Sequence, residues 1–350
     1  MRRCAAIRTE ARAGGLLTAF LFSIAVMVIF GGNISDRIGK KVTMSIGATI
    51  ISISIITGGF SFDYWTLVLI FSITGIGTGI FIAALYTFMG EAIPSLRGRL
   101  IGFTMGSFAL GGFLGPLIST LLILKFGWRS PFHVIGAFSL LLTFFLWLNS
   151  RDEFHIKKTK VDRRSYEFLK DSNIILLCVA FGIANFAFAA FTAWTPSYLI
   201  RIGNLSFSEA GFTFSLFSVT GAIGTSLFGI LSDKINRKKS ILISGILAFL
   251  LSLIFFSGLV KSTGLIVLTI LFGFVGYTFP NLIISTVQDL ADSKSLGSVT
   301  GFTFSIGMLG GAIAPALAGF LISNYGFSLT LVLLVSIFSL IYTIIASRAI

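Results

Sequence analysis

The residues of this chain that are best suited to electrostatic chemistry lie in a ten-residue block that occurs twice. The first copy reads GNISDRIGKK, from Gly32 to Lys41, and the second reads GILSDKINRK, from Gly229 to Lys238. Each copy places one acid beside several bases, and a carboxylate is favoured close to the positive N-terminal end of a helix. The candidate residues are Gly32, Asp36, Arg37, Gly39, Lys40, Lys41, Gly229, Asp233, Lys234, Arg237 and Lys238.

The glycines of the block indicate a tight connection between two helices. Gly32 and Gly229 have no Cβ, so we expect neighbouring helix ends to approach closely there. We expect Gly39 to turn the chain in a left-handed conformation, and Asn236, at the matching position, is the next residue type best able to do so. The alternative is that the charges only orient the chain in a membrane.

A second group of candidates consists of polar side chains inside long apolar stretches. Such side chains are costly at membrane depth, so they mark either a substrate site or a hydrogen bond between helices. Trp194 is also of a type that anchors helices at the membrane surface. The candidates for a substrate cavity are Tyr86, Asn185, Trp194, Tyr277 and Asn281.

Several kinds of chemistry are disfavoured by what the sequence lacks. No Asp, Glu, Lys, Arg or His lies near the centre of an apolar stretch, which argues against a proton-coupling carboxylate and against a carboxylate or phosphate substrate. Cys4 and Cys178 match no metal or redox spacing, and there is no P-loop for ATP. We therefore predict no enzyme, no metal and no cofactor.

The candidates are set in a strongly apolar chain. Of its 350 residues 55% are hydrophobic and 11% are charged, and the mean hydropathy is +0.98. A backbone in hydrocarbon must satisfy its own hydrogen bonds, so each crossing needs a helix of about 20 residues. The sequence predicts eleven such helices, at residues 15–34, 42–60, 66–88, 99–124, 131–149, 173–196, 208–231, 240–259, 264–287, 298–323 and 327–346.

A second pair of matching segments shows that the block belongs to a longer repeat. Gly102-Phe-Thr returns as Gly301-Phe-Thr, and Leu110-Gly-Gly with Pro116 returns as Leu309-Gly-Gly with Pro315. Gly32 and Gly229 are 197 residues apart, and the other pairs are 199 apart. So long a period indicates a duplicated half of a membrane transporter.

The distribution of positive charge predicts the orientation. If Asp36 is cytoplasmic and the sides alternate, 18 Lys and Arg residues lie inside, 4 lie outside, and the remaining 4 precede the first helix. This bias predicts a multi-pass protein of the plasma membrane with a cytoplasmic C-terminus. The net charge of +13 then belongs to loops at a lipid surface, so we expect no nucleic-acid partner.

The number of predicted helices differs between the halves. The second half has six and the first has five, because the partner of the helix at 173–196 would precede Met1. A missing first helix explains this best. A misplaced basic tail at residues 1–14 and a signal peptide are the alternatives.

The repeated block resembles the loop between the second and third helices of each half in the major facilitator superfamily. Gly32, Asp36, Arg37, Gly39 and Lys41 match that motif in the first copy. Gly229, Leu231, Asp233, Arg237 and Lys238 match it in the second. The resemblance implies two six-helix bundles related by a pseudo-two-fold axis. It also implies that Asp36 and Asp233 help latch the halves together, and that three predicted helices line a central cavity, those at residues 66–88, 173–196 and 264–287.

These observations predict an all-α polytopic membrane protein built from two bundles. We expect an N-terminal bundle at residues 1–149, a cytoplasmic linker at 150–172 and a C-terminal bundle at 173–350. The expected function is secondary transport of a small solute by alternating access, in a monomer embedded in the lipid bilayer. The alternative is a truncated membrane protein of the same fold that transports nothing.

Overall fold

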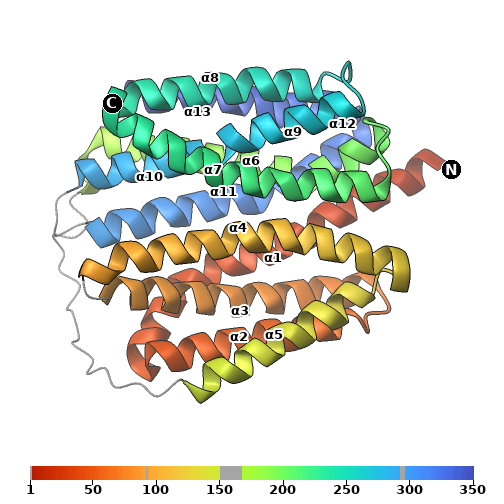
Figure 1. Ribbon diagram of the computed structural model, residues 1–350, viewed down its shortest axis with the longest axis horizontal. Coiled ribbons are helices and arrows are strands. Elements are labelled where there is room, and N and C mark those ends of the chain that lie inside the picture. The colour runs from red at the N-terminus through yellow and green to blue at the C-terminus, as the bar shows by residue number, and fades with distance from the viewer. Residues whose placement is uncertain (1, 92–93, 150–167, 292–295) are drawn as a thin grey trace. The chain divides into compact units, whose positions relative to one another are not determined.

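The computed structural model describes residues 2–91, 94–149, 168–291 and 296–350, and these ranges contain helices and no strand (Figure 1). The side chains of a few residues inside the helices, Asp36 and Asp233 among them, lie outside the description. The helices are α1 (Arg2–Ile38), α2 (Lys40–Gly58), α3 (Tyr64–Glu91), α4 (Pro94–Phe126), α5 (Ser130–Leu148), α6 (Ser172–Arg201), α7 (Phe207–Ile235), α8 (Arg237–Phe256), α9 (Thr263–Gly276), α10 (Thr278–Leu290), α11 (Leu296–Tyr325), α12 (Phe327–Leu331), the π-helix η2 (Val332–Ile337) and α13 (Phe338–Arg348).

The described helices confirm the predicted membrane architecture. Eleven helical spans within them are long and apolar enough to cross a bilayer, from Glu10–Gly31 at the start to Phe327–Arg348 at the end. Each of the eleven predicted ranges overlaps one of these spans. The chain is therefore an all-α polytopic membrane protein, as the apolar runs of about 20 residues require.

The beginning of the first helix differs from the prediction. We expected a helix from residue 15 preceded by a basic tail, whereas α1 begins at Arg2 and is 37 residues long. Most residues of the segment 2–14 are Ala, Arg and Glu, which favour helix strongly, so the helix extends through Gly14 and Gly15 without a break.

Two of the spans depart from a regular α-helix. The span Thr263–Leu290 is divided into α9 and α10 at Tyr277, next to Pro280. Proline has no N–H and its ring crowds the carbonyl four residues earlier, which here is Gly276. The last span contains the π-helix Val332–Ile337, a form that occurs often at functional sites.

Contacts between Cα atoms divide the chain into two compact units. The N-terminal unit consists of residues 15–107 and 118–160, and the C-terminal unit consists of residues 1–14, 108–117 and 161–350. The predicted domain boundaries stay a prediction, and most of the expected linker, residues 150–167, lies outside the described residues.

In the N-terminal unit, glycines let the helices pack closely. A Cβ added at Gly47 of α2 would lie 2.8 Å from the carbonyl oxygen of Gly77 in α3. Gly75 and Gly79, on another face of α3, pack against α1 in the same way, at Phe20 and Ile24. Small residues four apart thus bring three backbones together, which is how helices associate in lipid.

Hydroxyl groups join α2 to α5 in the same unit. The Ser52 hydroxyl lies 2.7 Å from that of Ser139 and 3.1 Å from that of Thr143. The indole N–H of Trp147 donates to the Thr49 hydroxyl at 2.9 Å. Hydrogen bonds between membrane helices contribute about 0.6 kcal/mol each on average, so this group supports the packing moderately.

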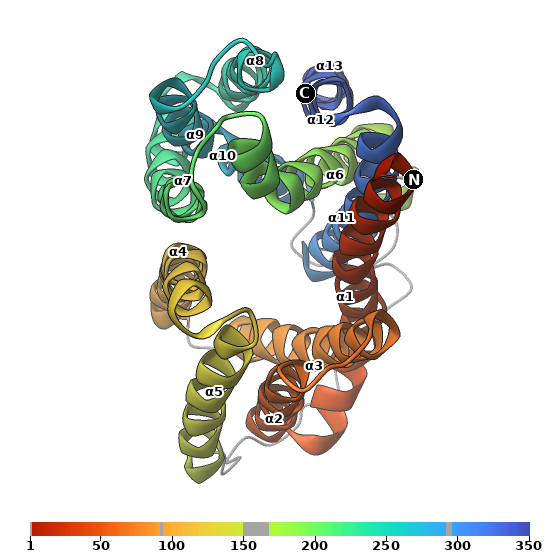
Figure 2. The ribbon, with the colours of Figure 1, turned by 90° about the vertical axis from the view of Figure 1, so that its right-hand side faces the viewer.

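The core of the C-terminal unit is aromatic and surrounds α6. Phe191, Tyr198, Phe217, Phe255 and Phe256 are fully buried there, and the Tyr198 hydroxyl donates to the Phe255 carbonyl at 3.0 Å. Offset and edge-to-face packing of such rings adds stability beyond the buried area. This core holds α6, α7, α8 and α9 together as one unit (Figure 2).

Candidate gating and substrate-binding residues

The first copy of the charged block forms the turn between α1 and α2. Helix α1 ends at Ile38 and α2 begins at Lys40, and Gly39 between them has φ 99° and ψ 145°. The positive φ that we expected at Gly39 is present, although ψ lies far from the left-handed helix value. The Thr43 hydroxyl donates to the Gly39 carbonyl at 2.6 Å and fixes the turn. The surroundings of Gly32 and the side chain of Asp36 lie outside the description.

The second copy forms the equivalent turn between α7 and α8. Asn236 has φ 128°, and its side-chain oxygen accepts a hydrogen bond from the Lys238 backbone N–H at 3.1 Å. An L-residue rarely adopts this conformation, and it costs about 1–3 kcal/mol. Lys234 is exposed and Lys238 is half-buried, while the side chain of Asp233 lies outside the description.

Arg237 joins this turn to the end of another helix. Its Nε donates to the Asp289 carboxylate at 3.0 Å, and its Nη1 donates to the Ser232 hydroxyl at 2.9 Å. Asp289 lies near the end of α10 and Ser232 lies near the end of α7, so one guanidinium connects three helices. The sequence does not signal this pairing, because residues 237 and 289 are 52 apart and meet only in the folded unit.

The predicted close approach at Gly229 is not found within the C-terminal unit. A Cβ added there would meet nothing within 4 Å, whereas one at Gly224 would lie 1.8 Å from the Phe274 carbonyl oxygen. The close contact of α7 with α9 therefore lies more than one helical turn before the charged block.

Tyr277 and Asn281 lie together at the break between α9 and α10. The Asn281 amide donates to the Tyr277 carbonyl at 2.8 Å, and the Tyr277 hydroxyl is 3.5 Å from the Ser218 hydroxyl. The rings of Phe188 and Phe217 pack at 4.9 and 5.0 Å from the Tyr277 ring. Asn281 is exposed and Tyr277 is half-buried, so both present polar groups halfway along a membrane span.

The other cavity candidates lie elsewhere. The Asn185 amide donates to the Phe181 carbonyl of its own helix at 2.9 Å, and it faces Gly307 of α11. Trp194 is buried within the C-terminal unit, and its indole N–H donates to the Pro315 carbonyl at 3.1 Å. Tyr86 is 39% exposed on α3 of the N-terminal unit. Within the C-terminal unit, Tyr277 and Asn281 are thus the two candidates that an interaction joins.

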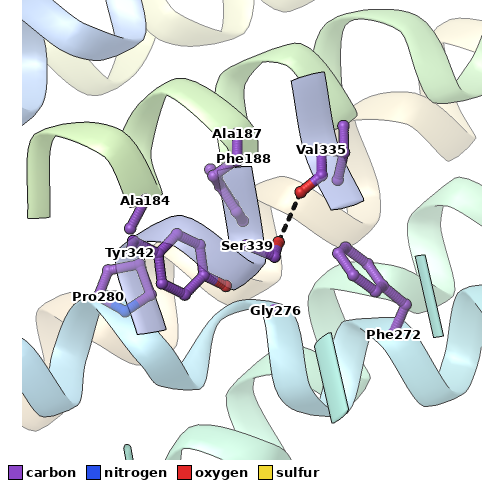
Figure 3. A pocket seen from close by; sticks show the side chains of 9 residues that line it. All are labelled: Ala184, Ala187, Phe188, Phe272, Gly276, Pro280, Val335, Ser339 and Tyr342. Carbon is purple, nitrogen blue, oxygen red and sulfur yellow. Dashed lines mark hydrogen bonds between the residues drawn. The ribbon is translucent and has the colours of Figure 1, made fainter. Parts of the chain in front are cut away.

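A small cavity borders the same helix break. Figure 3 shows Phe188, Gly276, Pro280 and Tyr342 around it, with the Ser339 hydroxyl donating to the Val335 carbonyl at 2.6 Å. The cavity has room for about one water molecule. It is far too small for an organic solute, so it marks loose packing between the kinked span and η2.

Sequence reasoning missed one buried acid. Glu10 lies in α1 and not in a tail, has a relative exposure of 6%, and forms an ion pair with Arg201 at the end of α6. Among the residues whose side chains are described, no three His, Cys, Asp or Glu side chains gather as a metal site would require.

Comparison with known proteins identifies the family. The sequence model described as Major Facilitator Superfamily matches residues 8–315 and 204–350. The chain is 27% identical over 335 residues to a hexuronate transporter of Bacillus subtilis, covering 89% of this chain and 79% of the relative. It is 28% identical over 332 residues to a cis,cis-muconate transport protein of Acinetobacter baylyi, covering 89% and 78%. It is 27% identical over 326 residues to the sialic acid transporter NanX of Escherichia coli, again covering 89% and 78%.

A solved structure has the same fold. The crystal structure of a bacterial homologue of the human lysosomal transporter Spinster, in an inward-facing and unoccupied conformation, superposes with a TM-score of 0.75 at 16% identity. The match covers 97% of this chain and 88% of that one. The chain belongs to the major facilitator superfamily and is a secondary transporter of small solutes.

Proposed function

We propose that this transporter carries a small organic acid and binds it beside Tyr277 and Asn281. The observation that carries the proposal is the break between α9 and α10, which lies halfway along a membrane span. Transporters of several folds bind substrate where a membrane helix is interrupted, because backbone and side-chain groups are released from regular helix bonding there. Tyr277 and Asn281 supply a hydroxyl and an amide at this point.

The solute class is supported by the relatives. Hexuronate, cis,cis-muconate and sialic acid, after which three of them are named, are all carboxylic acids. The sequence alone disfavoured a carboxylate, because no cation lies near the centre of a predicted helix. Hydroxyl and amide donors can hold a carboxylate without a cation.

We further propose that the two charged turns close the cytoplasmic side of the pathway as the halves rock. Gly32, Asp36, Arg37, Gly39, Lys40 and Lys41 form the first turn, and Gly229, Asp233, Lys234, Arg237 and Lys238 form the second. The charge bias of 18 to 4 supports a plasma-membrane protein with both turns and the C-terminus in the cytoplasm. We assign it no enzymatic step and expect a monomer.

Uptake by proteoliposomes tests the binding site with a matched control. Asn281→Ala removes an exposed amide that donates to the carbonyl four residues earlier. The control is Asn324→Ala on α11, which removes an exposed amide that also donates to the carbonyl four residues earlier. We expect saturable uptake of at least one organic acid by the wild type. Asn281→Ala should raise KM at least tenfold, and Asn324→Ala should leave KM unchanged. Equal KM values for the two variants would contradict the site.

Orientation has a separate test. In a chain with Cys4→Ser and Cys178→Ser, Arg37→Cys and Lys234→Cys, introduced one at a time, should each react with an impermeant thiol reagent in inside-out vesicles and remain unreactive in right-side-out vesicles. Labelling from opposite faces would contradict the proposed topology.

A further inference from the structure

Two of the few cations on the outer side lie in one short connection. Under the proposed orientation the outer Lys and Arg residues are Lys125, Arg129, Arg201 and Lys261, and the first two flank the turn between α4 and α5. Positive charge in a short outer connection opposes that orientation. A pair of cations at a place where they disfavour the topology calls for another role.

The turn between α4 and α5 lies at the depth of the lipid headgroups. The membrane span of α4 ends at Phe126, and that of α5 begins at Ser130. The turn at residues 59–63 lies between the spans of α2 and α3 in the same way. The two turns meet within the N-terminal unit, because Nη2 of Arg129 donates to the Ser61 carbonyl at 3.1 Å.

Arg129 is exposed, yet its guanidinium is held in place. The central carbon of the guanidinium lies 4.2 Å from the centre of the Trp128 ring, which is a cation–π contact. This contact and the bond to Ser61 use only part of a group that has five N–H donors. A guanidinium fixed in this way is suited to bind two phosphate oxygens at once.

The backbone that carries the two cations is also fixed. Gly127 has φ 85°, which an L-residue rarely adopts. The Ser130 hydroxyl lies 2.7 Å from the Gly127 carbonyl oxygen and 2.9 Å from the Leu122 carbonyl oxygen. A ligand of this turn would therefore meet a preorganised surface and lose little affinity to ordering it.

The two cations have no acidic partner within the protein. Among the described residues neither Lys125 nor Arg129 forms an ion pair. The acid of the neighbouring turn is Asp63, whose carboxylate accepts a hydrogen bond from the Thr66 backbone N–H at 2.9 Å and so caps α3. The two turns and Lys125 thus carry two cations against one acid.

Exposed aromatic rings accompany the cations. Phe62, Trp65 and Phe126 are 93%, 73% and 72% exposed, and all three lie in or next to the two turns. Aromatic rings are enriched at this depth, where headgroups meet acyl chains. Cations together with exposed rings fit a phospholipid, which offers a phosphate and apolar chains, better than they fit a free anion.

We infer that Lys125 and Arg129 bind the headgroup of an anionic phospholipid in the outer leaflet. The Arg129 guanidinium donates to the phosphate, the Lys125 ammonium adds a second positive charge, and the rings of Phe62 and Phe126 contact the upper acyl chains. An anionic headgroup neutralises the surplus positive charge, whereas the ammonium of a zwitterionic headgroup is repelled by it. The inference goes beyond the proposed function, and only the choice of leaflet rests on the proposed orientation.

Fluorescence quenching by brominated phospholipids tests the site in the full chain. Purified protein is reconstituted into equal mixtures of phosphatidylglycerol and phosphatidylcholine, in which one lipid or the other carries bromine on its acyl chains. The Trp128 signal is the difference between the wild type and Trp128→Phe. We expect brominated phosphatidylglycerol to quench Trp128 at least threefold more than brominated phosphatidylcholine does.

Three variants separate a site from a general effect of charge. Arg129→Gln combined with Lys125→Gln should bring the quenching ratio close to one. Lys125→Gln alone leaves the Arg129 contacts in place and should lower the ratio about twofold. Lys261→Gln removes another exposed outer cation, in the C-terminal unit, and should leave the ratio unchanged.

A wild-type ratio of one would overturn the inference. A ratio that Lys125→Gln and the double variant leave unchanged, or that Lys261→Gln lowers equally, would also overturn it. Because quenching requires no solute, a chain that transports no organic acid could still show the lipid preference. Failure of the proposed function and failure of the lipid site are therefore distinguished.

Discussion

Arg237 and Asp289 form an ion pair of 3.0 Å that fastens the start of α8 to the end of α10. The arginine belongs to the second charged block, and the aspartate belongs to the kinked span that carries Tyr277 and Asn281. The ion pair thus joins the charged turn to the kinked span within the C-terminal unit.

The strength of this pair can be measured by a double-mutant cycle with Arg237→Gln and Asp289→Asn. Because 55% of the Asp289 side chain is exposed, we expect a coupling of only about 0.2–1 kcal/mol, which salt weakens. Thermal unfolding in detergent at low and high salt checks this, with Lys239→Gln, an exposed neighbouring base, as the control. A coupling above about 2 kcal/mol, or one insensitive to salt, would contradict an exposed pair.

The two turns should respond in opposite ways to exchange of their central residues. Gly39→Ala forces a side chain into a backbone with φ 99° and should destabilise the protein by about 1–3 kcal/mol. Asn236→Gly relieves the same kind of strain at φ 128° and loses only the bond to the Lys238 N–H, so it should stabilise the protein. Melting temperatures of both variants provide the check, and a loss of stability in Asn236→Gly would be evidence against strain at this turn.

Close packing of α6 on α11 predicts a sharp difference between two glycines. A Cβ at Gly310 would lie 2.4 Å from the Gly182 carbonyl oxygen, whereas one at Gly106 of α4 would meet nothing within 4 Å. Gly310→Ala should therefore cost about 1–3 kcal/mol, because a buried backbone must shift. Gly106→Ala should be neutral or stabilise by up to about 1 kcal/mol through helix propensity. Equal melting temperatures for the two variants would show that α6 and α11 are not in close contact.

Asp63 predicts a pH dependence at the start of α3. Hydrogen bonds from the side chain and the backbone N–H of Thr66 lower the pKa of Asp63 below its ordinary 3.8. Because the folded pKa is the lower one, the stabilisation is present above pH 3.8 and is lost as the pH falls through the folded value.

The measurement compares melting temperatures of the wild type, Asp63→Ala and Asp63→Asn. Asp63→Ala should melt below the wild type at pH 7 by an amount that stays constant down to about pH 5. Asp63→Asn retains a capping oxygen, so its melting temperature should exceed that of Asp63→Ala by the same amount at every pH. That amount should be smaller than the advantage of the wild type over Asp63→Ala at pH 7. If the melting temperature of the wild type rose relative to that of Asp63→Ala as the pH fell below 5, the pKa of Asp63 would be raised by folding and not lowered.

The sequence predicted the membrane architecture because each helix needs an apolar run of fixed length, and such runs are visible without a structure. The duplicated block predicted the two turns for a similar reason, since positive φ restricts Gly39 and Asn236 to a few residue types. The beginning of α1 was missed because an Arg-rich segment with two glycines is typical of a tail. Its Ala, Arg and Glu residues nevertheless favour helix, and Glu10 finds its partner 191 residues later.

The binding-site candidates were only partly predictable. Tyr277 and Asn281 were candidates only as polar side chains in the predicted helix at residues 264–287, and the division of that span at Tyr277 was not predicted. Trp194 could not be placed, because an amphipathic ring suits both a membrane surface and a buried contact with a carbonyl, and only packing against α11 decides between them. The π-helix at Val332–Ile337 lies within a largely apolar stretch. Nothing in the sequence of that stretch indicates that its turns would be wider than those of an α-helix.

Counterflow in proteoliposomes tests transport most directly. Vesicles holding the purified chain are loaded with an unlabelled organic acid, such as a hexuronate, cis,cis-muconate or sialic acid, and diluted into a trace of the same acid in labelled form. A carrier with alternating access exchanges the two, so we predict that label accumulates transiently above its external concentration and that Asn281→Ala reduces this peak. Label that never exceeds the level in protein-free vesicles, for every acid tested, would contradict the account.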